Sequence, residues 1–212
     1  MTSWLRTATL ALLVIGASPV AARAELVAEP PPSGLAQPWG LAQPWGLAQL
    51  MADLRQVRSA TARFVESKQV QVLNQTLRSS GRLLYVAPDR LVKDTIEPSP
   101  ARLTVDGDRL VIEAAGESVR ELSLSEYPEL GALIGGIRWT LAGDLPALSR
   151  AFTLTLSGSA RSWTLALEPR DSRLRDLVAA IRIHGAGNAI HGIETLEADG
   201  DRGDMTIVAD RP

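Results

Sequence analysis

The chain has 212 residues, enough for one domain or for one domain with extensions. It contains no cysteine, which excludes disulfides, thiolate metal sites, a cysteine nucleophile and a lipid-modified cysteine. The 22 basic and 24 acidic residues give a net charge of −2 without any basic run, so nucleic-acid binding is not expected.

The first 24 residues have the layout of a secretory signal peptide. A short start carrying Arg6 precedes the apolar run Ala8–Ala17, and the small residues of Ala22-Arg23-Ala24 follow. The alternative is an uncleaved anchor helix, but the apolar run is well short of the roughly 20 residues that span a bilayer. We therefore expect cleavage after Ala24 and export to the periplasm, leaving 20 basic and 24 acidic residues.

Residues 25–46 are expected to form a flexible leader ahead of the folded domain. Three prolines stand at 30–32, and the unit GLAQPW then occurs twice before a third, partial copy. A period of six is too short for a solenoid repeat. A duplicated mobile segment is the favoured interpretation, and partner binding through Trp39 and Trp45 is the alternative.

The folded domain is expected over 47–210 and begins with a helix. Apolar residues recur at helical spacing and predict an amphipathic helix that packs on the following sheet. These residues are Leu47, Leu50, Met51, Leu54 and Val57. The period then changes to two, which predicts strands at 60–72, 75–87, 89–97, 101–105, 109–115 and 119–124. Asp106-Gly107 indicates a tight hairpin, because glycine accepts a positive φ.

Two short helices interrupt the strands. A serine and an acidic first turn predict one helix over 125–136, ending at Gly135-Gly136. Asp144 as cap and Pro146 in the first turn predict the second helix over 144–151. Strands resume at 152–158, 162–168, 178–184, 190–197 and 203–209. About eleven strands with short connections indicate a mainly β, α+β fold: an incomplete, strongly curved antiparallel β-barrel with helices across its open side.

Short motifs occur in a fixed order along this pattern. They are Phe64–Gln69, Ser80–Tyr85, Pro88–Leu91, Glu97-Pro98, Val105–Leu110, Ile190–Ile193 and Met205–Ile207. Their order, with a helical insertion between them, resembles the LolA family of lipoprotein carriers over residues 47–208. The resemblance implies an incomplete β-barrel closed by helices, an apolar interior for acyl chains, no cofactor and no catalysis.

The resemblance also implies a route for the cargo. The protein would be a periplasmic monomer that receives an acylated lipoprotein or another lipid from an inner-membrane transporter and passes it to an outer-membrane acceptor. The candidate lipid-binding residues are side chains of the strands and of the helical lid. They are Phe64, Leu83, Tyr85, Leu91, Val105, Leu130, Leu133, Ile134, Ile137 and Trp139.

The chain departs from the family pattern at two places. Members usually carry an arginine before the proline that matches Pro88, and that arginine helps hold the lid; here the residue is Ala87. Lys93 and Thr95 stand where the family tends to place large apolar residues. These departures favour altered cargo or gating. They leave open a carrier of a non-lipoprotein lipid working with a membrane exporter, or an interaction module with a filled interior.

The residues do not indicate catalysis or a metal site. No nucleophile elbow, phosphate loop or dinucleotide fingerprint occurs, and the two histidines lack a third metal ligand. The segment Asp199–Asp204 lacks the spacing of a calcium loop and indicates a hairpin turn. Glu66, Glu113 and Glu117 are interpreted as solvated strand positions. The sequence therefore predicts a binding protein that is not an enzyme.

Overall fold

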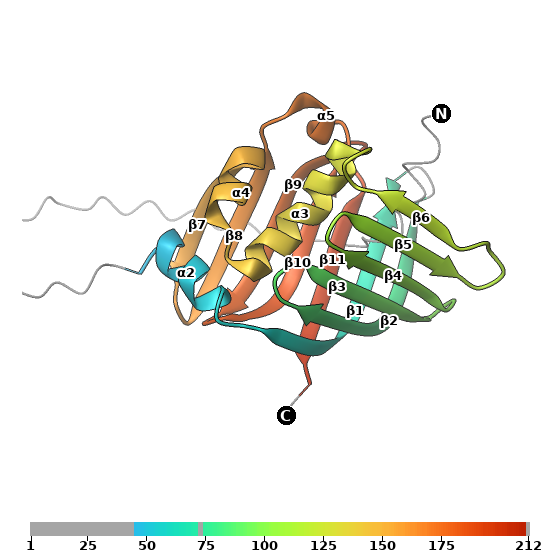
Figure 1. Cartoon of the computed structure of the whole chain (residues 1–212), viewed down its shortest axis with the longest axis horizontal. Coiled ribbons are helices and arrows are strands. Elements are labelled where there is room, and N and C mark those ends of the chain that lie inside the picture. Colours follow the sequence, from blue (N-terminus) through green and yellow to red (C-terminus); the bar gives the residue numbers. More distant parts are fainter. Residues whose placement is uncertain (1–44, 72–73, 211–212) are drawn as a thin grey trace, which may run out of the picture.

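The computed structural model describes residues 45–71 and 74–210 (Figure 1). The predicted signal peptide and most of the predicted leader lie outside the described residues. Four helices are described: α2 (Leu47–Leu54), α3 (Pro128–Ala142), α4 (Leu145–Ala151) and α5 (Ser172–Arg175). None of these helices is long and apolar enough to cross a membrane.

All described strands belong to one antiparallel sheet with the order β6-β5-β4-β3-β2-β1-β11-β10-β9-β8-β7. In the first half they are β1 (Ser59–Val70), β2 (Gln75–Val86), β3 (Arg90–Glu97), β4 (Ala101–Asp106), β5 (Arg109–Ala114) and β6 (Arg120–Ser123). In the second half they are β7 (Phe152–Ser159), β8 (Ser162–Pro169), β9 (Val178–Ala186), β10 (Ala189–Glu197) and β11 (Arg202–Ala209).

The two halves of the sheet are joined by the first and last strands. Within each half, strands that follow one another in sequence are paired, but β1 also pairs with β11, which places Phe64 opposite Ile207 and Glu66 opposite Met205. β6 and β7 are left at the two ends of the sheet, so the barrel is not closed. The expected open, antiparallel sheet of about eleven strands is confirmed.

Helix α3 lies across the concave face of the sheet, between the β7–β9 side and the β4–β6 side (Figure 1). Its Leu133 belongs to the main core, together with residues of α2, α4, β8 and β9. Its Leu130 and Ile134 pack instead with residues of β4 and β5 and with Leu124. α3 therefore bridges two groups of apolar residues that the open sheet holds apart.

The bounds predicted for this helix are wrong at both ends. Helix α3 begins at Pro128 rather than at residue 125, and Tyr127 before the proline has non-helical φ and ψ of −130° and 71°. The helix also continues through Gly135-Gly136, and Gly135 leaves room for the ring of Trp139, which would lie 2.6 Å from a Cβ at this position. It ends at Gly143, which has the left-handed φ of 63° that favours glycine.

Other local predictions are confirmed. The Asp144 carboxylate caps α4 by accepting a hydrogen bond from Ala147 N at 3.0 Å. The Asp106-Gly107 hairpin joins β4 to β5, and Gly107 has a φ of 58°. In α2, Leu50, Met51 and Leu54 are buried in the main core with residues of the sheet, and the helix also packs on α3. Helix α5 was not expected.

Candidate functional site

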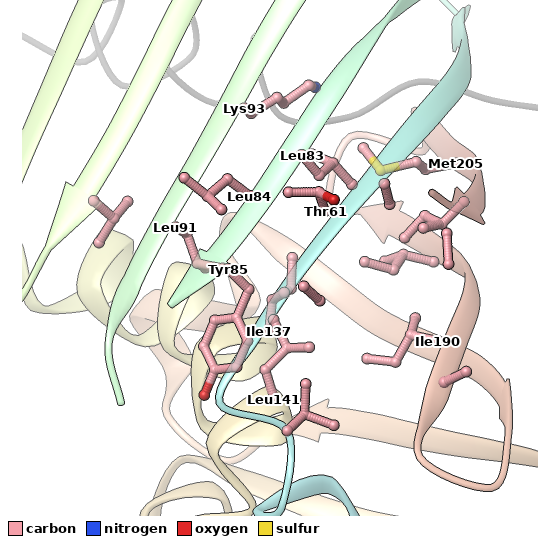
Figure 2. Close-up of a pocket in the computed structure, with 18 of the residues that line it drawn as sticks. Thr61, Leu83, Leu84, Tyr85, Leu91, Lys93, Ile137, Leu141, Ile190 and Met205 are labelled. Atoms are coloured by element: carbon pink, nitrogen blue, oxygen red, sulfur yellow. The ribbon is translucent and has the colours of Figure 1, made fainter. Parts of the chain in front are cut away.

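A cavity of about 310 Å³ lies between the concave face of the sheet and α3 (Figure 2). Apolar side chains from both halves of the sheet and from the helix make up most of its wall. They include Leu83, Leu91, Leu103 and Val105 of β2–β4, Ile190, Ile193, Met205 and Ile207 of β10–β11, and Ile134, Ile137 and Leu141 of α3. Such a wall suits a ligand that is itself mainly apolar.

The cavity occupies one end of the sheet. Its residues come from the start of β1, the last residues of β2, the start of β3 and the end of β4, and equally from the start of β10 and the end of β11. Because neighbouring strands are antiparallel, all of these positions lie at the same end, beside the turn at 87–89 and the turn at 187–188.

Charged side chains fill the interior toward the end of the sheet opposite to the cavity. On β1, Glu66 and Lys68 face inward with the same period of two as Phe64, and both are almost completely buried. Lys68 Nζ lies 2.7 Å from Glu197 Oε1 and 3.3 Å from Asp201 Oδ2. The interpretation of Glu66 as a solvated position is therefore wrong, since β1 lies in the middle of the sheet and this face is covered.

The boundary between the apolar and the charged regions is an ion pair. Lys93 Nζ lies 2.5 Å from Glu66 Oε2, which also accepts a hydrogen bond from Ser79 Oγ at 2.8 Å. Burial lowers the pKa of Lys93, while the charge of Glu66 and its hydrogen bond act in the opposite direction. Lys93 lines the cavity, so the pair forms its floor.

Burial also affects the second ionic group. It raises the pKa of Glu197, against the hydrogen bond and charge of Lys68. Glu197, Asp199 and Asp201 bring carboxylate oxygens within 4.8 Å of one another. The ammonium of Lys68 already provides the cation that Glu197 and Asp201 need.

Tyr85, a residue of the cavity wall, carries a hydroxyl that is shielded from solvent. The side chain is only 4% exposed, and its hydroxyl has no hydrogen-bond partner among the described residues. Burial raises the pKa of this phenol; the negative charge of Asp89 raises it further and Arg58 lowers it. Thr61 and Asn188 add two further polar side chains to the lining.

Two arginines tie α3 to its neighbours, one to the sheet and one to α2. Arg138 of α3 donates a hydrogen bond from Nη1 to the carbonyl oxygen of Gly107, in the β4–β5 turn. Arg55, which follows α2, donates from Nη2 to the carbonyl oxygen of Gly143 at 2.6 Å.

Six of the ten predicted lipid-binding residues line the cavity: Leu83, Tyr85, Leu91, Val105, Ile134 and Ile137. The other four lie outside its wall. Phe64 is buried with its ring centroid 5.0 Å from Lys93 Nζ, Leu130 packs on β4 and β5, Leu133 is in the main core, and Trp139 packs against that core. The prediction for α3 therefore included its apolar residues without distinguishing those that face the cavity from those that face the core.

The wall formed by β10 and β11 was missed. Ile190 and Ile193 both line the cavity although they are three residues apart, which strict alternation along a strand does not allow. The β9–β10 register shifts between Ile190 and Gly192, and this bulge turns both side chains to the same face. Met205 and Ile207 keep the period of two, but only the pairing of β11 with β1, opposite Glu66 and Phe64, brings them into this wall.

An open barrel that encloses an apolar cavity under a helix defines a binding protein for an apolar ligand. The sequence profile described as outer membrane lipoprotein carrier protein LolA-like matches residues 41–210, and the chain belongs to this LolA-like family. The family consists of periplasmic carrier or binding proteins rather than enzymes. The family assignment made from the ordered motifs is confirmed.

Solved structures with a similar fold have little sequence in common with the chain. A LolA superfamily protein from Nitrosomonas europaea is 11% identical, with 78% of this chain and 93% of that one covered and a TM-score of 0.43. A DUF1329 family protein from Desulfovibrio piger is 10% identical, with coverages of 76% and 88% and a TM-score of 0.40. The MucA/MucB complex of Pseudomonas aeruginosa gives 16% identity, coverages of 76% and 53%, and a TM-score of 0.39. No curated protein matches the chain.

Proposed function

We propose that this protein is a periplasmic carrier that shelters lipoprotein acyl chains in its cavity and moves them from the inner toward the outer membrane. The observation that carries the proposal is the apolar cavity between the sheet and α3. Exposing an acyl chain to water costs about 0.8 kcal/mol per CH₂ group, so a carrier between two membranes must enclose it. Membership of the LolA-like family and the signal-peptide layout of the first 24 residues support the location.

A carrier must also release its cargo, and α3 is the element suited to that step. Its cavity-facing residues Ile137 and Leu141 touch the space where the cargo would lie, whereas its attachment to the β4–β5 turn depends on the hydrogen bond from Arg138. A lid of this kind needs open and closed states that differ by only a few kcal/mol. We propose that movement of α3 away from β4 and β5 opens the cavity.

A second function is favoured by the floor of the cavity. Lys93 and Glu66 occupy space that longer or additional chains would need. The alternative is therefore a carrier of a non-lipoprotein lipid that works with a membrane exporter. Both functions require the same cavity and differ in the cargo.

The test is to purify the mature protein from its own periplasm and to identify bound molecules by mass spectrometry. Acylated peptides or lipoproteins would support the first function, and free lipid would support the second. An empty protein that also fails to take up a fluorescent fatty-acid probe would contradict both and favour an interaction module.

A pair of variants on β1 makes the probe experiment specific. Ala62→Trp fills the cavity from its wall and should abolish uptake of the probe. Val65→Trp is the matched control, because Val65 lies on the same strand, is 59% exposed and is not part of the cavity wall. Equal uptake by the two variants would show that the probe binds elsewhere.

A further inference from the structure

The wall of the cavity becomes more exposed toward one end. On the inner face of β1, Ala60 is exposed, whereas Ala62 is 9% exposed and Phe64, two residues further in, is 1% exposed. On the inner face of β11, Ala209 is exposed and Met205 is 8% exposed. Ala60 and Ala209 both line the cavity, so solvent reaches the lining at the start of β1 and the end of β11.

Asn188, in the β9–β10 turn, is another exposed residue of the lining. Thr61 is exposed as well, but it alternates with Ala60 along β1 and belongs to the outer face. We call Ala60, Asn188 and Ala209 the rim. They lie at the same end of the sheet, because neighbouring strands are antiparallel. Their side chains are two methyl groups and one neutral amide, which leave an opening that large side chains would fill.

The opposite end of the cavity is closed by the buried ion pair. Lys93 is the only charged residue of the lining within the described part of the chain, and its Nζ lies 2.5 Å from Glu66 Oε2. Figure 2 shows Lys93 at one end of the drawn residues, with Leu141 and Ile190 toward the other. Ile190 follows Asn188 by two residues, so the rim and the ion pair lie at opposite ends of the cavity.

The difference between the two ends decides how an acyl chain lies. A carboxylate head at the inner end would lie beside the buried carboxylate of Glu66, whose charge already neutralises Lys93, and the two like charges would repel. A neutral ester head would lose its water there. At the rim, either head remains hydrated. The chain therefore lies with its terminal methyl group toward Lys93 and its polar head at the rim.

The rim stays open while α3 is closed. None of its three residues belongs to α3, which is tied to the sheet by the hydrogen bond from Arg138 to Gly107. A cavity of about 150 Å³ holds one benzene molecule, so the cavity of about 310 Å³ corresponds to about a dozen carbon atoms. It cannot enclose the polypeptide of an acylated protein. That part of the cargo needs an opening in the closed carrier.

We propose that the rim is the entrance through which an acyl chain passes with its methyl end first, and through which the polar part of the cargo remains outside while α3 is closed. This inference rests on the proposed carrier function and specifies the orientation of the cargo. Ala60 and Ala209 are then specificity-determining residues, because their small side chains admit a chain that carries a bulky polar head.

The chain has no cysteine, so single thiols can be used to block the rim. Ala209→Cys and Val208→Cys place neighbouring thiols on opposite faces of β11, since Val208 is 53% exposed and is not part of the lining. Both unmodified variants should take up a fluorescent fatty-acid probe as wild type does. After reaction with a bulky maleimide, uptake should be lost for the thiol at 209 and retained for the thiol at 208. Equal uptake by the two modified proteins, whether retained or lost, would overturn the entrance.

A bimane label on Val208→Cys lies beside the rim and reports the orientation of the chain. Stearic acid with a doxyl nitroxide close to its carboxylate should quench the label more strongly than stearic acid with the nitroxide close to its methyl end. The reverse order would overturn the proposed orientation. If unmodified wild type binds neither acid nor the fluorescent probe, the carrier function itself fails. Binding to wild type that is not affected by the maleimide at 209 contradicts the entrance alone.

Discussion

Replacing Lys93 with methionine removes the cation at the floor of the cavity and leaves Glu66 buried. Glu66 is 2% exposed, and its remaining hydrogen bond comes from Ser79 Oγ at 2.8 Å. Breaking a buried ion pair by removing one partner typically costs about 3–5 kcal/mol. The Ser79 hydrogen bond and the adjoining cavity place the expected loss in the free energy of unfolding near the lower end, at about 3 kcal/mol.

The double variant Lys93→Met, Glu66→Met separates the charge from the packing. Replacing both members of a buried pair by apolar residues of similar volume is often close to neutral. The double variant should therefore regain at least about 2 kcal/mol relative to Lys93→Met. Its cavity floor would be apolar, and longer acyl chains should bind to it more tightly than to wild type.

Urea denaturation near neutral pH, followed by tryptophan fluorescence, measures these free energies. Arg102→Met is the control, because its partner Asp94 stands next to Lys93 on β3, but the side chains of Arg102 and Asp94 are 55% and 34% exposed. An exposed pair contributes only about 0–1 kcal/mol. If Lys93→Met costs no more than Arg102→Met, or if the two methionine substitutions are additive, the buried pair is not the floor described above.

Further predictions concern the lid and the second ionic group. Arg138→Ala removes the hydrogen bond from α3 to Gly107 and should speed release of a bound fluorescent probe severalfold, with a melting temperature close to that of wild type; unchanged release would exclude this lid contact from gating. Ile137→Asp should stay folded and lose the probe, whereas Leu133→Asp should fail to fold because Leu133 lies in the main core, as circular dichroism would reveal. Burial raises the pKa of Glu197 above 4.5, so the stability that the titration of Glu197 adds to wild type, relative to Glu197→Gln, should be complete below pH 4.5. This added stability should be lost as the pH rises through the folded-state pKa. Urea denaturation at several pH values measures it, and a difference between the two proteins that does not change with pH would contradict the prediction.

The features that were predicted correctly from the sequence depend on residues that are close together along the chain. Strand positions followed from apolar alternation, the β4–β5 hairpin from Asp106-Gly107, and the start of α4 from Asp144. The error in the predicted end of α3 comes from contacts between residues that are far apart along the chain. Glycine propensity predicts an end at Gly135-Gly136, but Gly136 packs closely on other elements: a Cβ built there would lie 3.1 Å from Phe152 and 3.4 Å from Ile181. Tertiary contacts outweigh the local preference there.

The sequence by itself determined the strands, the open antiparallel sheet and the family, because these follow from periodicity, turn residues and ordered motifs. Only the tertiary structure decided where the cavity lies and which side chains it presents. Pairing of β1 with β11 brings Met205 opposite Glu66 across most of the chain length, and a bulge turns Ile190 inward. Glu66 of β1 and Lys93 of β3 are both buried inside the curved sheet, where they must satisfy each other's charge.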